Sequence, residues 1–83
     1  MTGLYVRNAV KCFAKAMEHE LRNNDHKRGW LNESPEDLLV HLKEEVAELE
    51  RALKFPDVED PRGEAADVAN LAMMIWDVIG GPQ

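Results

Sequence analysis

Two pairs of carboxylates, each with a spacing of three residues, are the chemically most informative feature of the sequence. Glu45 and Glu48 form the first pair, and Glu64 and Asp67 form the second. Residues three apart on an α-helix lie on adjacent turns of one face, so each pair would project toward one point. Two antiparallel helices would then bring four oxygen-donor groups together. An all-oxygen donor set suits Mg²⁺ or Mn²⁺ better than Zn²⁺, and four negative charges leave room for one or two ions.

A divalent ion held by carboxylates from one side keeps open positions for water and for phosphate oxygens. Such an ion polarises a phosphoryl group, lowers the pKa of a bound water and offsets charge on a leaving pyrophosphate. A carboxylate beside the ion can accept the proton of that water. Glu44 and Glu48 are the candidates for this base, and the sequence assigns the role to neither. The pattern therefore predicts metal-assisted phosphate chemistry.

The positions of the acids on helical wheels bear on whether they form a metal site or a solvated surface. At about 100° per residue, Glu45 lies about 20° from Leu38, inside the apolar arc of its predicted helix. A glutamate-rich run on an amphipathic helix is more often a solvated, salt-bridged face. Arg62 is, however, the only basic residue between positions 55 and 83. Local ion pairs therefore do not account well for Glu64 and Asp67, and burial of unpaired carboxylates is costly.

Helix-capping residues, prolines and glycines divide the chain into three predicted helices, over residues 4–22, 35–54 and 61–79. Ser34–Pro35 and Asp60–Pro61 are start signals, because the first residue can cap the helix and proline suits its first turn. A proline shortly after position 54 and two glycines after position 79 are end signals. No strand pattern is present. The sequence therefore predicts an all-α fold.

The third predicted helix is apolar around most of its circumference from Ala65 to Trp76. Such a helix is buried on several sides, and two companion helices in an 83-residue chain do not easily cover it. With one cysteine, the chain has no intramolecular disulfide to stabilise it. We therefore predict a single domain over residues 1–83, a three-helix protomer that completes a four-helix or larger bundle by homo-oligomerisation. The alternative is a monomer with an exposed Met and Ala patch.

Composition limits the partners and the compartment. The chain has 16 acidic and 10 Lys or Arg residues, a formal net charge of −6, which argues against nucleic-acid binding. The longest apolar run, Leu71–Trp76, is six residues long, whereas a membrane-spanning helix needs roughly 20. Arg7 and Lys11 interrupt the N-terminal apolar residues, unlike a secretory signal. We therefore expect no membrane association and a cytoplasmic location.

The connection between the first two predicted helices carries candidate substrate contacts. Trp30 can stack on a base, and Lys27 or Arg28 can meet phosphates. The alternative for Trp30 is that it packs the connection onto the second helix while the cations are solvated. Lys54, at the end of the second helix, is a further phosphate candidate. Asn70, three residues after Asp67, can orient a carboxylate or contact substrate.

The arrangement Glu45-x-x-Glu48, fifteen residues, then Glu64-x-x-Asp67 resembles the motif of the MazG-like all-α nucleoside triphosphate pyrophosphohydrolases. The resemblance covers residues 30–79. The stretch from Trp30 to the second predicted helix is similar to the dCTP pyrophosphatase branch of the family. It implies Mg²⁺-dependent cleavage of (d)NTP to (d)NMP and pyrophosphate, in house-cleaning of nucleotide pools, by a dimer or a dimer of dimers. The same resemblance implies that the four motif acids are the metal ligands.

Two other interpretations remain open from the sequence. Phosphoribosyl-ATP pyrophosphatases share a related acid pattern and a similar size, so the substrate can differ from a nucleoside triphosphate. A non-catalytic, acidic helical oligomerisation module can also carry such acids, either as vestiges or around a structural ion. Release of pyrophosphate separates the enzymes from the module.

Overall fold

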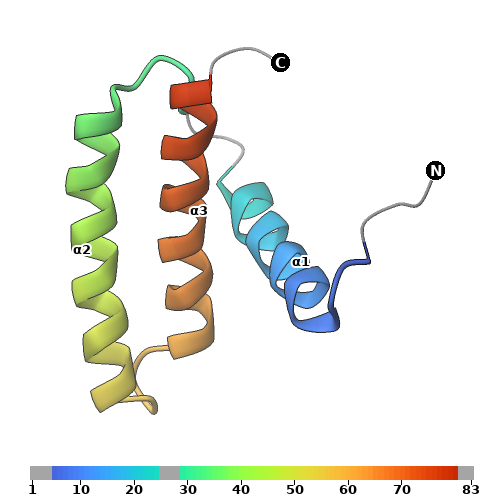
Figure 1. The fold of residues 1–83 in the computed structure, drawn as a ribbon. Helices are drawn as coiled ribbons and strands as arrows, with labels where there is room; N and C mark the ends of the chain where they lie inside the picture. The colour runs from blue at the N-terminus through green and yellow to red at the C-terminus, as the bar shows by residue number, and fades with distance from the viewer. Residues whose placement is uncertain (1–4, 25–28, 81–83) are drawn as a thin grey trace.

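A computed structural model describes residues 5–24 and 29–80. They form three helices, α1 (Asn8–Asn23), α2 (Pro35–Lys54) and α3 (Pro61–Gly80), and no strand. The predicted all-α class is confirmed for these residues. Figure 1 shows α2 and α3 side by side and antiparallel, with α1 inclined against the other side of α3. The central position of α3 explains its apolar circumference, because it packs against both other helices.

The bounds of α2 follow from its terminal residues. The Ser34 hydroxyl accepts a hydrogen bond from the backbone N–H of Asp37 at 3.1 Å, which satisfies one otherwise unpaired donor of the first turn. Pro35 occupies the first turn, where its missing N–H costs nothing. The helix ends at Lys54, since Phe55 precedes a proline and is driven out of helical geometry. These are the predicted bounds, 35–54.

The start of α3 is fixed by an aspartate. The Asp60 carboxylate accepts a hydrogen bond from the backbone N–H of Arg62 at 3.0 Å, and the Asp60 carbonyl accepts one from Glu64. The helix therefore begins at Pro61, as predicted, and continues through Gly80, one residue beyond the predicted end. These capping contacts place Glu64 in the first turn of α3.

The predicted start of the first helix is wrong. Tyr5, Val6 and Arg7 are not helical, and α1 begins at Asn8 and ends at Asn23 instead of spanning 4–22. Arg7 is extended (φ −67°, ψ 154°) and supplies no side-chain cap. Tyr5 is 97% exposed, so packing does not stabilise a further turn. Apolar periodicity extended the prediction by one turn without a start signal to support it.

The protomer covers little of its own apolar surface. Among the described residues, the buried apolar side chains are Leu38, Ala52 and Ala66. Large apolar side chains remain exposed on all three helices, including Val10, Phe13, Leu53, Trp76 and Ile79. In the described part of the chain, no other element covers these exposed apolar faces of the helices. None of the helices in the described part of the chain is sufficiently long and apolar to cross a bilayer.

Candidate metal centre and adjoining pocket

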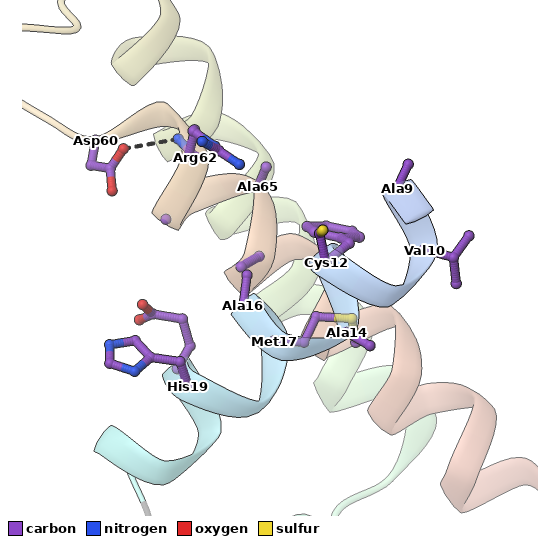
Figure 2. Close-up of a pocket in the computed structure, with 14 residues that line it drawn as sticks. Ala9, Val10, Cys12, Ala14, Ala16, Met17, His19, Asp60, Arg62 and Ala65 are labelled. Atoms are coloured by element: carbon purple, nitrogen blue, oxygen red, sulfur yellow. Dashed lines mark hydrogen bonds between the residues drawn. The ribbon is translucent and has the colours of Figure 1, made fainter. Parts of the chain in front are cut away.

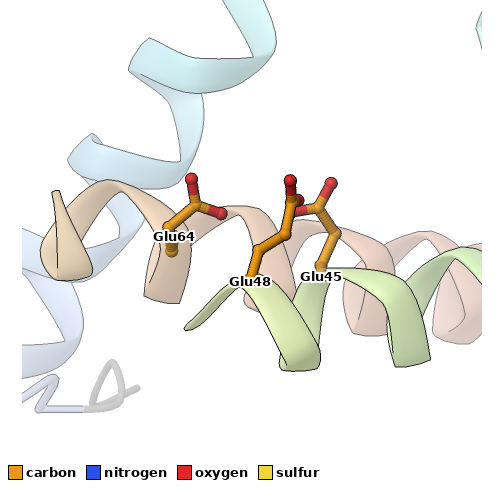
Figure 3. Close-up of side chains that lie close together, drawn as sticks. All are labelled: Glu45, Glu48 and Glu64. Carbon is orange, nitrogen blue, oxygen red and sulfur yellow. The ribbon is translucent and has the colours of Figure 1, made fainter. Parts of the chain in front are cut away.

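Three motif carboxylates meet where α2 and α3 lie side by side. One oxygen from each of Glu45, Glu48 and Glu64 lies within 4.8 Å of the other two. Figure 3 shows Glu45 and Glu48 extending from α2, and Glu64 from α3, with their carboxyl groups on the same side of the helix pair. The spacing of three residues aligns the two α2 acids. The antiparallel packing of α3 brings Glu64 to them.

Two oxygens of this cluster are buried without a partner. Glu45 Oε2 and Glu64 Oε2 accept no hydrogen bond from the described residues. Burial raises the pKa of Glu45 to about 8, and the adjacent Glu48 carboxyl group adds to the increase. Burial likewise raises the pKa of Glu64, with the charge of Glu48 as the next cause. Neither solvent nor a neighbouring cation fully stabilises negative charge in the cluster, so its carboxyl groups release their protons less readily than free ones.

Glu48 differs from the other two acids because it has a basic neighbour. Arg51 Nη2 lies 3.7 Å from Glu48 Oε1, while Arg51 Nε donates to Glu59 at 2.8 Å. These are exposed contacts, which contribute little to stability. Within the described residues, no Lys or Arg forms an ion pair with Glu45 or Glu64. Ion pairing at the surface thus explains part of the environment of Glu48. It does not explain the positions of Glu45 and Glu64.

Asp67 lies next to the cluster and faces a fifth acid. It is not part of the set joined by the 4.8 Å distances. Burial raises its pKa to about 6, with the charge of Glu20 on α1 as the next cause and Glu64 after it. Sequence reasoning did not identify Glu20, although a signal was present: on the wheel of α1, Glu20 lies about 20° from Phe13, beside the apolar stripe. Glu20 therefore lies beside an apolar arc of its helix, as Glu45 does.

A pocket of about 600 Å³ adjoins the acids between the end of α1, the connection before α2, and the faces of α2 and α3. Glu20, Glu45 and Asp67 line one part of it, and Trp30, His41 and Asn70 line others. The pocket therefore joins a carboxylate-rich region to an aromatic side chain. Its volume is sufficient for a nucleoside-sized ligand.

Trp30 is anchored to α3. Its indole Nε1–H donates a hydrogen bond to Asp77 Oδ2 at 3.0 Å, in a partly buried position. From the sequence, one interpretation was that Trp30 packs the connection onto the second helix. Its hydrogen bond instead joins it to the third helix, α3. The contact fixes the indole as a wall of the pocket.

Replacement of Asp77 tests this anchor. We expect Asp77→Ala to reduce the free energy of unfolding by about 1 kcal/mol, since a partly buried indole N–H loses its acceptor. Trp30 emission should also shift to longer wavelength as the indole becomes hydrated. Asp77→Asn keeps an acceptor oxygen and should resemble the wild type. Urea unfolding followed by tryptophan fluorescence in a Trp76→Phe background measures both effects, and an Asp77→Ala protein indistinguishable from Asp77→Asn would refute the anchor.

Asn70 is the buried polar side chain of α3, at 4% exposure. Its Nδ2 donates a hydrogen bond to the backbone carbonyl of Met17 at 3.0 Å and so joins α3 to α1. Its Oδ1 is buried and has no hydrogen-bond partner among the described residues. Asn70 also lines the pocket. The residue thus holds two helices together and retains an unused acceptor.

Two of the remaining candidates, Glu44 and Lys54, lie apart from this site. Glu44 is exposed on α2 and is not one of the three clustered acids. Lys54 is exposed at the last position of α2 and does not line the pocket. Lys27 and Arg28 lie outside the described residues. The structure therefore gathers three of the four predicted metal ligands closely, with Asp67, Trp30 and Asn70 around the pocket beside them.

The fold and the cluster define the class of this chain: an all-α protein with a three-carboxylate site at an antiparallel helix pair. It is 41% identical over 63 residues to a protein of Archaeoglobus fulgidus that is described as an uncharacterized protein. The alignment covers 76% of this chain and 68% of the archaeal one. The chain therefore belongs to the same family as this archaeal protein. No protein-family model and no solved structure matches the chain.

Proposed function

We propose that this chain is a MazG-like, Mg²⁺-dependent nucleoside triphosphate pyrophosphohydrolase, which converts (d)NTP to (d)NMP and pyrophosphate. The observation that carries the proposal is the cluster of Glu45, Glu48 and Glu64, whose oxygens lie within 4.8 Å of one another beside a pocket of about 600 Å³. The spacing of the motif acids supports the same assignment. A nucleotide substrate favours the cytoplasm, where nucleotide pools are held, and the net charge of −6 favours a nucleotide over nucleic acid as the partner.

The residues present fit a hard divalent cation. All donors in the cluster are carboxylate oxygens, the ligands that Mg²⁺ and Mn²⁺ prefer. Two of the oxygens are buried and unpartnered, which is costly unless a cation joins them. Glu45, Glu48 and Glu64 would hold one ion, and Asp67 would complete the set or hold a second. When bound, the ion supplies charge stabilisation for the phosphates and acidifies a coordinated water.

The roles of the protein residues follow from their positions. Glu45 and Glu64, without a basic partner, serve as ligands. Of the two candidate bases, Glu48 lies in the cluster and Glu44 does not, so we assign acceptance of the water proton to Glu48. Arg51 Nη2, at 3.7 Å from Glu48 Oε1, adds positive charge beside that carboxylate. The pocket holds the nucleoside, with Trp30 as its aromatic wall.

The exposed apolar surface supports assembly into a dimer or tetramer that completes a four-helix or larger bundle. A second, mainly apolar pocket of about 760 Å³ lies between α1 and the start of α3. Figure 2 shows its small lining side chains, among them Ala9, Ala16 and Ala65, with Asp60 and Arg62 at one end. Small side chains let another helix approach closely. A second copy would cover this groove and bury apolar side chains that the single protomer leaves in water.

Sedimentation tests the assembly. We expect the wild-type protein to sediment as a dimer or tetramer at micromolar concentration, because one protomer buries too little apolar surface to be stable alone. Its Tm should rise with protein concentration, since association stabilises the folded state by mass action. A monomer whose Tm is independent of concentration would contradict the proposed bundle.

The proposed activity is tested with a panel of nucleotides. Purified protein is incubated with the common (d)NTPs and with phosphoribosyl-ATP, in Mg²⁺ or Mn²⁺, and pyrophosphate release is followed. We expect release from at least one (d)NTP and none in EDTA. Preferred release from phosphoribosyl-ATP would support the related enzyme instead. A folded, oligomeric protein that releases pyrophosphate from no member of the panel would leave the non-catalytic oligomerisation module.

A further inference from the structure

The side of the α2–α3 pair that faces away from the clustered acids is apolar and exposed. We call it the outer face, and its exposed side chains are Leu39, Val46 and Leu53 of α2 and Ala72, Trp76 and Ile79 of α3. At about 100° per residue, those on α2 lie within about 40° of one another and those on α3 within about 60°. On the wheel of α2, Glu48 lies about 160° from Val46. The outer face is therefore a separate surface from the metal centre.

Helix handedness places the two stripes of the outer face on the same side of the pair. Leu38 of α2 is 1% exposed at the contact with α3, and Val46 is turned from it by about 80°. Leu71 of α3 lines the pocket with Leu38, and Ala72 is turned from Leu71 by about 100° in the same sense. In an antiparallel pair of right-handed helices, turns of the same sense from the contact line lead to one side. The stripes therefore form a continuous apolar surface, which is typical of an interaction site.

Two charged side chains of opposite sign border the outer face on α2. Lys43 lies about 60° and Glu50 about 40° from Val46 on the helical wheel. Both are exposed, and neither forms an ion pair with another described residue. They are seven positions apart, which is about 10 Å along a helix and too far for an ion pair within one chain. Val46 lies midway between them, so a two-fold rotation about an axis beside Val46 would bring Lys43 of each copy near Glu50 of the other.

We propose that a second copy of this chain packs on the outer face, with the two α2 helices antiparallel about a two-fold axis beside Val46. In this register, Val46 meets its own counterpart, and Leu39 of each copy meets Leu53 of the other. The Lys43–Glu50 contact occurs twice, once on each side of the axis. Because both the apolar stripe and the charges match themselves under one rotation, the occupant that fits this face is a copy of the same chain.

The ends of the helix pair support the same arrangement. The rotation brings the C-terminal part of α3 in one copy toward the α2–α3 turn of the other. Trp76 and Ile79 are each 69% exposed in the protomer, and Phe55 and Val58 of the turn are exposed as well. Burial of these side chains against one another removes apolar surface from water. The outer face is distinct from the groove between α1 and α3, none of whose lining residues belongs to it, and the interface does not depend on the proposed reaction.

Charge reversal tests the register. We expect Lys43→Glu or Glu50→Lys alone to raise the Kd of association about tenfold, because each brings like charges together at two symmetric contacts. The double variant with both reversals should return to within about threefold of the wild-type Kd. Glu50→Gln removes only exposed attractions and should change Kd by less than about threefold. Sedimentation equilibrium of the full chain in EDTA measures each Kd without a contribution from metal.

Single cysteines test the same register without a change of charge. In a Cys12→Ser background, Val46→Cys should form a disulfide-linked dimer on oxidation, because it lies beside the axis. Leu39→Cys and Leu53→Cys should cross-link when the two proteins are mixed and not when each is alone. Ala47→Cys, which is exposed on another face of α2, is the matched control and should remain monomeric on denaturing gels.

Three results would overturn the proposal: a monomeric wild-type protein, a double reversal that associates as weakly as either single one, or cross-linking of Ala47→Cys in preference to Val46→Cys. These results are distinguishable from failure of the proposed function. Hydrolysis of a (d)NTP by a protein that fails the reversal test would remove this interface and leave the pyrophosphohydrolase. Recovery of association in the double reversal without hydrolysis of any (d)NTP would leave the interface and remove the reaction.

Discussion

Glu45→Gln is expected to lower turnover of the preferred nucleotide by about a thousandfold, comparable to the loss of a main electrostatic stabiliser in other active sites. Glu45 supplies one of the oxygens within 4.8 Å in the cluster, and its Oε2 is buried without a partner. A neutral amide keeps the shape of the side chain and removes its charge. The cation would then bind weakly, and the phosphates would lose their charge stabilisation.

The same substitution should leave the fold intact. In metal-free protein, Glu45→Gln removes the repulsion that an ionised Glu45 experiences from Glu48 and from Glu64, so the free energy of unfolding should be higher near pH 8, where Glu45 ionises, and unchanged at lower pH. Glu50→Gln, an exposed acid on the same helix, is the matched control and should retain wild-type turnover. Steady-state pyrophosphate release and thermal unfolding in EDTA measure the two effects. Wild-type turnover in Glu45→Gln would contradict its assignment as a ligand.

Metal-free protein is expected to lose stability as the pH rises from about 5 to about 8. Burial raises the pKa of Glu45 from 4.5 to about 8, and that of Asp67 from 3.8 to about 6. Because the folded state binds these protons more tightly, their contribution is complete below the unfolded values and is lost as the pH passes the folded values. After allowance for solvent screening, the loss is about 1 to 2 kcal/mol. Tm should fall by about 5 to 10 °C.

Circular dichroism melts in EDTA, at fixed protein concentration and between pH 5 and pH 8, measure this slope. Mg²⁺ should raise Tm more at pH 8 than at pH 6, since the cation competes with protons for the same oxygens. Glu45→Gln should have a much flatter pH profile without metal. A metal-free wild-type Tm that increases across this window would contradict the raised pKa values and the charge repulsion behind them.

Local signals made α2 and α3 predictable. Ser34 with Pro35, and Asp60 with Pro61, fix the starts of these helices through contacts within a few residues. In the structure, the Ser34 hydroxyl accepts a hydrogen bond from the backbone N–H of Asp37, and the Asp60 carboxylate accepts one from that of Arg62. The first helix lacks such a signal, and its predicted start extended one turn too far. Periodicity identifies the apolar face of a helix more reliably than its ends.

The site was predictable as far as it depends on helical spacing. The pairs Glu45–Glu48 and Glu64–Asp67 are visible in the sequence because three-residue steps align side chains on one helix. Contacts between distant residues were not visible. Trp30 and Asp77 are 47 positions apart, and Asn70 reaches Met17 across 53. Such contacts depend on how the helices pack, which one-helix patterns do not determine.

The most direct test of the carboxylate cluster as a pyrophosphohydrolase centre is ³¹P NMR of a reaction with an accepted (d)NTP in Mg²⁺. We expect the triphosphate signals to be replaced by those of a nucleoside monophosphate and pyrophosphate, and Glu45→Gln and EDTA each to prevent the change. Production of nucleoside diphosphate and orthophosphate, or an unchanged triphosphate spectrum with folded wild-type protein, would contradict it.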